Sequence, residues 1–403
     1  MKGNKKWAFL GVHPHTGGTF TVFQNLRKGL LEQGVDLRWV SAGAKKAKQA
    51  MEFPEYKKYG IVIEPDEIRE DLIAVALKEH LLNYDVVVVN VLCDRICTNV
   101  IRYLEQKVFR VMLVHNSTIG TYKAAASVRK YVHGVICVSP RIVDDLIQKY
   151  NFNPSVTKHI PNAIEFNKYA CSMTKSFVEL RILVLSRIEN RSKGCFKIPK
   201  VLNELEKKNI SYNCTVVGDG EDLRELKKRC RGLSIKFLGN VKSEMIPDII
   251  KNHNIYLFPS NYEGFGLSLV EAMAGGCVPV SARLRGVTDQ IIEHKRDGFL
   301  VETANIEEYV KYIIYLHENR NELNRMAQQA TISIANKFSL ESVASTFIKT
   351  LKNIQGMNVE VESGLNLETW SYPQGLKPGL RTYLPEPIKN CLRLYRERSV
   401  KHK

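Results

Sequence analysis

The sequence has no long hydrophobic run. Its purely apolar stretches, such as Val86–Val89, are only a few residues long, whereas a helix that spans a bilayer needs about 20 mostly apolar residues. The basic start from Met1 to Lys6 leads into a short strand-like segment that ends in His13-Pro14-His15. That segment is too short and too polar for a signal peptide. We therefore expect a cytoplasmic protein without a spanning segment.

Cysteine motifs and a dinucleotide motif are also missing. The nine cysteines are scattered, with no Cys-x-x-Cys pair and no zinc-type spacing. Cys93 and Cys97 stand four positions apart, which fits one face of a helix as well as a pair of ligands. Buried free thiols in a reducing compartment are the expected state. No Gly-x-Gly-x-x-Gly motif follows the first strand, and Asp36 is not a convincing ribose acid, so a nicotinamide site has little support.

Positive charge is in excess and unevenly placed. The net charge is +17, of which residues 101–200 carry +11 while residues 201–350 balance to zero. A basic surface is typical of proteins that bind nucleic acid, an anionic membrane or an anionic substrate. The chain has no nucleic-acid module and no interleaved stacking aromatics. We therefore expect a membrane or a phosphate-bearing acceptor as partner, and no nucleic acid.

Strand-like runs alternate with amphipathic segments along the whole chain, which predicts an α/β protein with parallel sheets. In the first half, strands are expected at Trp7–Val12, Leu37–Ser41, Val86–Leu92, Val108–His115, Val135–Ser139 and Thr157–Pro161. In the second half they are expected at Leu180–Ser186, Cys214–Val217, Ile235–Leu238, Ile255–Phe258, Val278–Ser281 and Phe299–Val301. A polar stretch separates the halves. The predicted domains are 1–165 and 179–338, with a linker at 166–178 and a final helix plus basic tail at 339–403.

Two carboxylates mark the second half. Glu263 and Glu271 stand eight positions apart, after a buried strand that stops at Pro259 and around a Gly-rich turn. A helix is expected to begin at Leu267, which puts Glu263 in the loop and Glu271 in the first turns of the helix. Both then line a crevice at the carboxyl end of a strand, where open α/β sheets bind ligands and where a helix amino end favours phosphate.

This segment, continued through residues 272–280, resembles the Glu-x7-Glu signature of the retaining GT-B glycosyltransferases of the family 4 type. The resemblance implies two Rossmann-like domains that face each other across a cleft, with a last helix near 339–370 that crosses back onto the first domain. It also implies transfer of a sugar from a nucleoside-diphosphate sugar to a glycan or lipid-linked acceptor. Bacterial cell-surface polysaccharide synthesis is the process in which similar enzymes act.

The resemblance assigns roles to residues of the second half. Glu263 becomes a catalytic residue, and Glu271 accepts hydrogen bonds from the ribose. Arg187 and Lys193 are similar to a pair that holds the donor phosphates, where fixed cations favour a transition state in which the leaving diphosphate gains charge. The remaining donor-binding residues would be Gly218, Asn240, Gly264, Phe265, Gly266 and Leu267.

In the first half, Gly17-Gly18 follows a strand and opens a helix. The resemblance places this double glycine beside the donor diphosphate; a tight turn needed for packing is the alternative. His115 ends a strand where family members often have a histidine near the transferred sugar, and we take it as a second catalytic candidate. A strand-end histidine can equally be structural.

Two segments depart from the family pattern. Ala163 replaces the glycine of a Pro-Asn-Gly element, and Arg285–Asp289 stands where many members have Gly-Gly-x-x-Glu. The sugar is therefore not predicted. No Asp-x-Asp metal motif is present, so we expect no metal and no cofactor. A GT-B phosphorylase, a nucleotide-sugar epimerase or a silent carbohydrate-binding protein are the other possibilities.

The tail suggests a surface contact. Eight Lys or Arg lie between Ser371 and Lys403, around an apolar helical face. This segment predicts either an interfacial helix on anionic lipid or a helix docked on the first domain. Further basic residues follow the second strand, and they support a peripheral contact with the inner face of the cell membrane. The apolar face comprises Leu384, Ile388, Cys391, Leu392 and Tyr395, and the second basic cluster comprises Lys45, Lys46, Lys48, Lys57 and Lys58.

Overall fold

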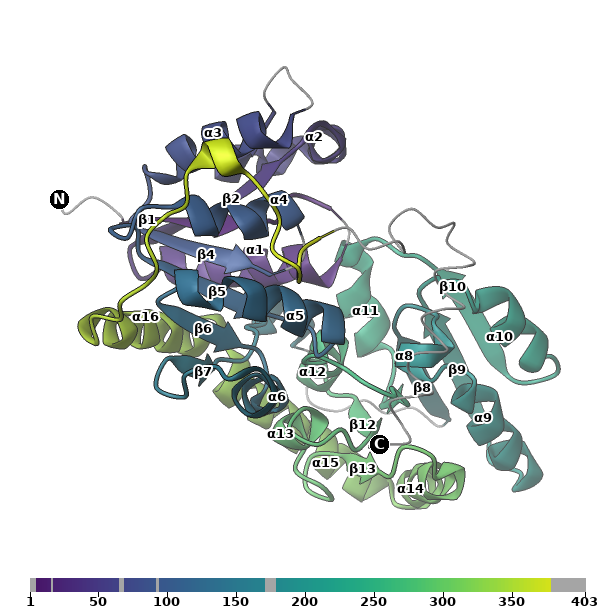
Figure 1. Ribbon diagram of the computed structural model, residues 1–403. Helices are drawn as coiled ribbons and strands as arrows, with labels where there is room; N and C mark the ends of the chain where they lie inside the picture. The colour runs from purple at the N-terminus through teal and green to yellow at the C-terminus, as the bar shows by residue number, and fades with distance from the viewer. Residues whose placement is uncertain (1–4, 16, 65–68, 92–93, 171–178, 378–403) are drawn as a thin grey trace.

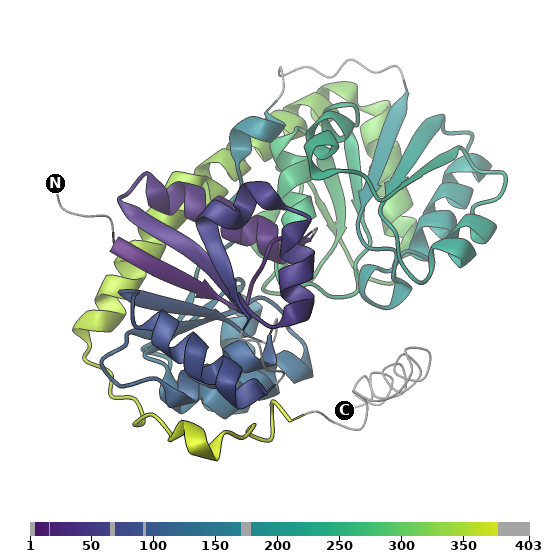
Figure 2. The same cartoon turned by 90° about the horizontal axis from the view of Figure 1, so that it is seen from above.

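Two parallel sheets, each covered by helices, form two α/β units that face each other (Figures 1 and 2). The computed structural model describes residues 5–15, 17–64, 69–91, 94–170 and 179–377. Both units have the Rossmann-like alternation of strand and helix that the sequence predicts. Within the described ranges, no helix combines the length and the apolar character that crossing a bilayer requires.

The first sheet has seven parallel strands in the order β3-β2-β1-β4-β5-β6-β7. Its central strands are buried on both faces, which explains why Val86–Val89 in β4 is a continuous apolar run. The strands are β1 (Lys5–Leu10), β2 (Val35–Ala42), β3 (Gly60–Ile63), β4 (Val86–Asn90), β5 (Arg110–Val114), β6 (Gly134–Cys137) and β7 (Thr157–His159). The helices are α1 (Gly18–Leu31), α2 (Ala44–Met51), α3 (Glu70–Leu81), α4 (Arg95–Val100), α5 (Ile119–Val128) and α6 (Pro140–Tyr150).

The second sheet has six parallel strands in the order β10-β9-β8-β11-β12-β13. The order reverses between β8 and β11, and the crevice at such a switch point is where open sheets bind ligands. The strands are β8 (Leu180–Leu185), β9 (Tyr212–Val217), β10 (Ile235–Gly239), β11 (Ile255–Phe258), β12 (Val278–Ala282) and β13 (Phe299–Val301). The helices are α8 (Asn190–Lys193), α9 (Lys197–Lys207), α10 (Leu223–Arg229), α11 (Ile246–Lys251), α12 (Leu267–Ala274), α13 (Thr288–Ile291), α14 (Ile306–Glu318) and α15 (Arg320–Phe338).

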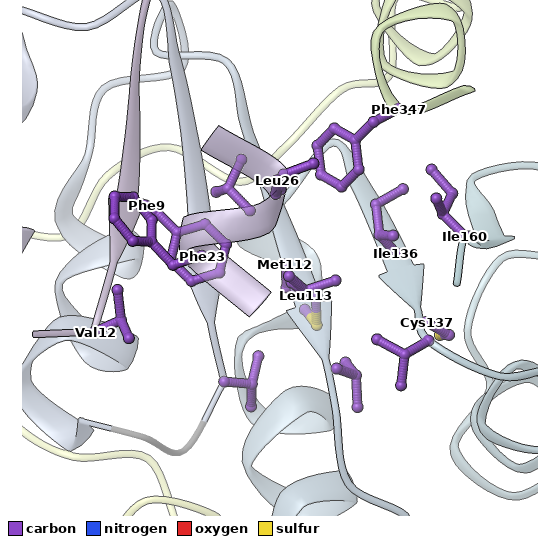
Figure 3. Packing of buried hydrophobic residues seen from close by; sticks show 14 of the residues in the cluster. Phe9, Val12, Phe23, Leu26, Met112, Leu113, Ile136, Cys137, Ile160 and Phe347 are labelled. Carbon is purple, nitrogen blue, oxygen red and sulfur yellow. The ribbon is translucent and has the colours of Figure 1, made fainter. Parts of the chain in front are cut away.

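The last helix, α16 (Leu340–Gly356), belongs to the core of the first unit. Figure 3 shows its Phe347 near the aliphatic and aromatic side chains that α1 and the first sheet contribute. Phe347 is 2% exposed, and its ring lies 6.3 Å from that of Trp7. Gly29 lets α1 approach closely, because a Cβ atom there would lie 2.4 Å from the carbonyl oxygen of Leu340. The chain thus returns from the second unit to complete the first.

After α16, residues 357–377 form an irregular strap along the first unit, drawn in yellow in Figures 1 and 2. The amide of Leu365 donates to the carbonyl of Arg102 at 2.8 Å, and the rings of Trp370 and Tyr103 lie 4.8 Å apart. Leu376, near the end of the strap, is 1% exposed. The basic helix expected between Leu384 and Tyr395 lies outside the described residues.

The structure describes only the start of the predicted linker. Phe166–Tyr169 forms the short helix α7, which packs against α11 and α12, and residues 171–178 lie outside the described ranges. The sequence analysis also missed the short elements α2, α4, α8, α11, α13 and β3. Strand β3 is a short, partly exposed edge strand, and such a strand lacks the buried apolar pattern that identified its neighbours.

Candidate active site

A cleft of about 1530 Å³ lies between the two sheets, at the edges where their strands end. Loops after β1 and β5 line it on one side, and loops after β8, β9, β10 and β11 line it on the other. Every residue predicted for the site borders this cleft. These residues are Gly17, Gly18, His115, Arg187, Lys193, Gly218, Asn240, Glu263, Gly264, Phe265, Gly266, Leu267 and Glu271.

Glu263 lies in the loop Pro259–Gly266, here called the signature loop, which joins β11 to α12. Its carboxylate oxygen Oε1 accepts a hydrogen bond from Lys193 Nζ at 2.6 Å and from Ser260 Oγ at 2.9 Å. The side chains of Lys193 and Glu263 are 24% and 10% exposed. A pair this shielded holds its geometry more firmly than a surface ion pair, so the cation and the carboxylate face the cleft in fixed positions.

Backbone contacts hold Lys193 in place. Gly194 ends α8 in the left-handed conformation, with φ of 60°, and a Cβ atom there would lie 2.2 Å from the carbonyl oxygen of Pro259. The amide of Asn261 also donates to the carbonyl of Ser192 at 2.7 Å. The α8 segment and the signature loop therefore form one rigid surface. The exposed Arg187 follows β8 and lines the same cleft.

The signature loop also touches the first unit. A Cβ atom on Gly264 would lie 1.8 Å from the carbonyl oxygen of His115, so the two backbones are in direct contact. Ser117 Oγ donates to the carbonyl of Glu263 at 3.3 Å. Only glycine permits this approach. The contact places the loop that carries Glu263 against the strand end that carries His115.

His115 is a neutral group in this setting. Burial lowers the pKa of its imidazole to about 4. Its Nε2 atom is buried and has no hydrogen-bond partner among the described residues. A buried polar atom left in this way costs stability. The imidazole can therefore offer a hydrogen bond, but not a positive charge, to a molecule in the cleft.

Glu271 lies in the second turn of α12, with part of its side chain facing the cleft. Burial of the carboxylate raises its pKa to about 7, against a hydrogen bond from Tyr169 and the charge of Lys168. Sequence reasoning missed Tyr169, Lys168 and Ser260. No local sequence pattern identifies them. Tyr169 and Lys168 act on a residue that is distant in the chain, and Ser260 belongs to no recognisable motif.

The glycine turns divide into two kinds. A Cβ atom on Gly218 would lie 2.0 Å from the carbonyl oxygen of Ser186, so packing between neighbouring loops requires glycine there. At Gly18, no described atom lies within 4 Å of the Cβ position. Packing in the described chain therefore does not require Gly18, and open space for a ligand remains beside it. Asn240 is exposed at the cleft rim.

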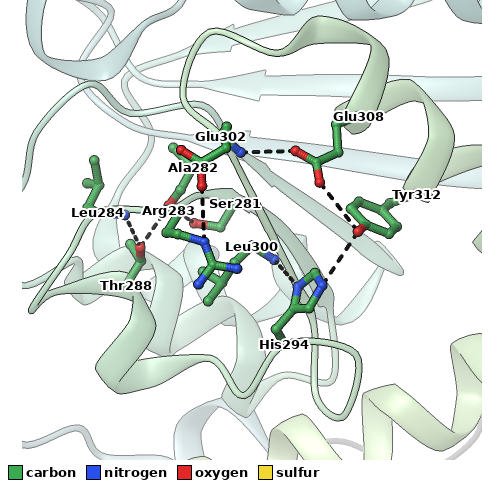
Figure 4. A network of polar contacts seen from close by, with 10 residues as sticks. All are labelled: Ser281, Ala282, Arg283, Leu284, Thr288, His294, Leu300, Glu302, Glu308 and Tyr312. Atoms are coloured by element: carbon green, nitrogen blue, oxygen red, sulfur yellow. Dashed lines mark hydrogen bonds and ion pairs between the residues drawn. The ribbon is translucent and has the colours of Figure 1, made fainter.

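Arg285–Asp289, the segment whose sequence differs from the family pattern, follows β12. A polar network around Thr288 holds it (Figure 4). Thr288 Oγ1 accepts from the amide of Leu284 and donates to the carbonyl of Ala282, both at 2.7 Å. The carbonyl of Gly286 accepts from the amide of Arg141 at 3.2 Å, which adds another backbone contact between the units. No cluster of three or more His, Cys, Asp or Glu suited to a metal occurs in the described part of the chain.

The raised pKa of Glu271 should make the stability of the protein depend on pH. The pKa of Glu271 rises from 4.5 to about 7 on folding, so its contribution to the free energy of unfolding is complete below pH 4.5 and is lost as the pH rises through 7. Glu271→Gln removes this loss. We expect the variant to exceed the wild type by roughly 1–3 kcal/mol at pH 8 and by much less at pH 5. Urea unfolding at pH 5 and pH 8 measures this difference in the free energy of unfolding. The exposed Glu360→Gln is the control and should show no such pH dependence. A difference for Glu271→Gln that does not change with pH would contradict the raised pKa of Glu271.

Comparisons with known proteins agree with this arrangement. Residues 178–332 match the family model described as "Glycosyl transferases group 1", and residues 16–168 match "Glycosyltransferase Family 4". An uncharacterized glycosyltransferase of Haemophilus influenzae is 24% identical over 346 residues, which cover 81% of this chain and 94% of that protein. The UDP-Gal:alpha-D-GlcNAc-diphosphoundecaprenol alpha-1,3-galactosyltransferase of Escherichia coli is 25% identical over 224 residues, 51% of this chain and 56% of that protein.

Among solved structures, HepE of Anabaena in complex with UDP and glucose superimposes with a TM-score of 0.70 at 18% identity, over 86% of this chain and 99% of that chain. A likeness at this identity bears on the fold, and the two family models bear on the sequence of both halves. The chain therefore belongs to the glycosyltransferases of the group 1 and family 4 type and has the GT-B fold.

Proposed function

We propose that this glycosyltransferase moves a sugar from a nucleoside-diphosphate sugar to a glycan or lipid-linked acceptor with retention of anomeric configuration, in bacterial cell-surface polysaccharide synthesis. Two relatives support the substrate classes. The E. coli relative is named for a UDP-sugar donor and a diphosphoundecaprenol acceptor, and HepE was crystallised with UDP and glucose. The overlap with the E. coli relative covers about half of each chain.

The observation that carries the proposal is the group of charges around the signature loop. Lys193 is fixed against Glu263 at 2.6 Å, Arg187 lines the same cleft, and α12 begins directly after the loop. A diphosphate leaving group gains negative charge as its bond to the sugar breaks. Cations and a helix amino end that are fixed in advance stabilise that charge without reorganisation. We propose that these groups meet the diphosphate without a metal ion.

In the proposed reaction, the bond from the anomeric carbon to the diphosphate oxygen breaks, and the acceptor hydroxyl attacks the same face. The acceptor proton passes to the departing oxygen, so the enzyme needs no covalent intermediate. Glu263 would orient the hydroxyls of the transferred sugar. The neutral His115, whose buried Nε2 has no partner among the described residues, would donate or accept one further hydrogen bond to that sugar.

A panel of nucleotide sugars tests the function. The correct donor at 100 times its dissociation constant should stabilise the protein by about 2.7 kcal/mol, and transfer should persist in EDTA. The anomeric proton of the product, read by NMR, should report an α linkage from an α-linked donor. A β-linked product from an α-linked donor would show that the enzyme inverts the anomeric configuration, and the proposed retention would be wrong. Release of sugar 1-phosphate from a glycoside and phosphate, without nucleotide, would favour a phosphorylase instead.

Loss of a phosphate-binding cation should slow transfer. Arg187→Ala and Lys193→Ala each remove charge that acts most strongly in the transition state, so we expect kcat to fall by ~10²–10³ and KM for the acceptor to change little. Steady-state kinetics with the donor found above measures both. The exposed Lys200→Ala in α9 is the matched control. Near-wild-type turnover in both variants would show that the diphosphate binds elsewhere.

A membrane-bound acceptor would suit the basic surface of the first unit. Among the lysines after β2, Lys46 pairs with Asp94, while Lys45, Lys48, Lys57 and Lys58 are exposed on or beside α2. Each exposed basic residue near an anionic bilayer contributes ~1 kcal/mol, reduced by salt. We propose a reversible peripheral contact. The tail that was predicted to assist it lies outside the described residues.

Liposome flotation tests this contact. The full chain should float with anionic vesicles at low salt and less with neutral vesicles, and replacing these exposed lysines by glutamine should weaken flotation. Replacing Lys200, Lys207, Lys208 and Lys236, exposed on the second unit, should not. If the wild type never floats with anionic vesicles, the proposed contact is wrong.

A further inference from the structure

Tyr169 is a buried residue of the short helix α7, which connects the two units. It is 8% exposed, and α7 packs against α11 and α12. A Cβ atom on Gly275, just after α12, would lie 3.5 Å from the carbonyl oxygen of Tyr169. The backbone of Tyr169 is therefore held against the helix that carries Glu271.

Ion pairs anchor α7 to the first unit as well. Glu165 Oε2, directly before α7, lies 2.6 Å from Lys28 Nζ of α1 and 2.7 Å from Lys168 Nζ. Asn25 of α1 donates to the carbonyl of Ala163 at 2.9 Å. Tyr169 thus stands on a segment that is fixed from both sides, which is the condition for orienting another side chain.

Tyr169 and Glu271 both line the cleft, and the phenol lies close enough to the Glu271 carboxylate to oppose the rise in pKa that burial causes. Lys168 of α7 and Tyr256 of β11 are further titratable groups that interact with this carboxylate. Tyr256 directs its hydroxyl to the carbonyl of Leu185 and to Ser268 Oγ, both at 2.9 Å. Its hydroxyl is thereby engaged away from Glu271.

We propose that Tyr169 is a positioning residue of the nucleotide site: its phenol donates a hydrogen bond to one carboxylate oxygen of Glu271, so that the second oxygen meets the ribose hydroxyls of the donor. The proposal rests on the proposed function. An ionised carboxylate accepts hydrogen bonds at both oxygens. With one oxygen held by the phenol, the other is presented to the cleft in a fixed direction, and less rotational freedom is lost when the nucleotide binds.

The proposed hydrogen bond also favours the ionised form of Glu271. Burial raises the pKa of this carboxyl to about 7, and the phenol acts in the opposite direction. Without the phenol, the pKa rises further, and at neutral pH more of the group carries a proton. A protonated carboxyl is a poorer acceptor for ribose hydroxyls. Tyr169 should therefore affect both the orientation and the charge of Glu271.

Binding of UDP and of 2′,3′-dideoxy-UDP tests the proposal, with the GDP pair as a second probe. The two nucleotides carry the same titrating phosphates, so the ratio of their affinities isolates the ribose hydroxyls. We expect Tyr169→Phe to weaken UDP binding roughly tenfold at pH 7 and to leave dideoxy-UDP within about twofold. The loss should shrink at pH 9, because Glu271 is then ionised in both proteins.

Tyr309→Phe is the matched control. Tyr309 is fully buried in the second unit, and its hydroxyl has no partner among the described residues, so its loss should change neither affinity. Thermal unfolding confirms that both variants fold, and Glu271→Gln supplies the reference for loss of the carboxylate charge.

The outcomes separate this inference from the proposed function. If the wild type prefers UDP to dideoxy-UDP and Glu271→Gln loses that preference, but Tyr169→Phe keeps it at every pH, the role of Tyr169 is refuted while the nucleotide site stands. If the wild type binds neither nucleotide pair and transfers no sugar, the proposed function itself fails.

Discussion

The direct contact between the backbones of Gly264 and His115 is the constraint on which the site depends. A Cβ atom at position 264 would lie 1.8 Å from the carbonyl oxygen of His115, so no other residue lets the two units meet there. The contact brings the ends of two separate sheets together and makes one cleft from them. Fixed cations from one unit and the double glycine from the other can then act on a single molecule.

Several charged side chains of the cleft are already paired with one another in the structure. Lys193 is paired with Glu263, and Glu165 is shared by Lys28 and Lys168. Such pairs limit the repulsion among cations, and they hold long side chains in one orientation. Glu271 is the exception, because its burial raises its pKa to about 7. A site that keeps a carboxylate in this condition accepts a lower stability in exchange for function, as ligand sites commonly do.

Most strands and many residues of the candidate site could be predicted from the sequence, for a physical reason. Buried parallel strands are apolar on both faces, so β4, β8, β11 and β12 stand out as short, mainly apolar runs. Residues of the site follow β8 and β11 directly, and all of those predicted border the cleft. Tyr169 could not be predicted, because its contact with Glu271 joins positions about a hundred residues apart. Helix α2 was missed since its sequence, AKKAKQAM, offers little apolar surface.

The strap after α16 has a mechanical consequence. Its contacts at Arg102, Tyr103 and Lys130 all lie on the first unit, and Leu376 is still buried where it ends. If the units open and close about the chain crossings near Ile164 and Ser339, the strap travels with the first unit. The position of Lys377 then keeps a constant distance from the side of the cleft that the first unit forms. A group attached to the chain after Lys377 is therefore tethered to the first unit and not to the second.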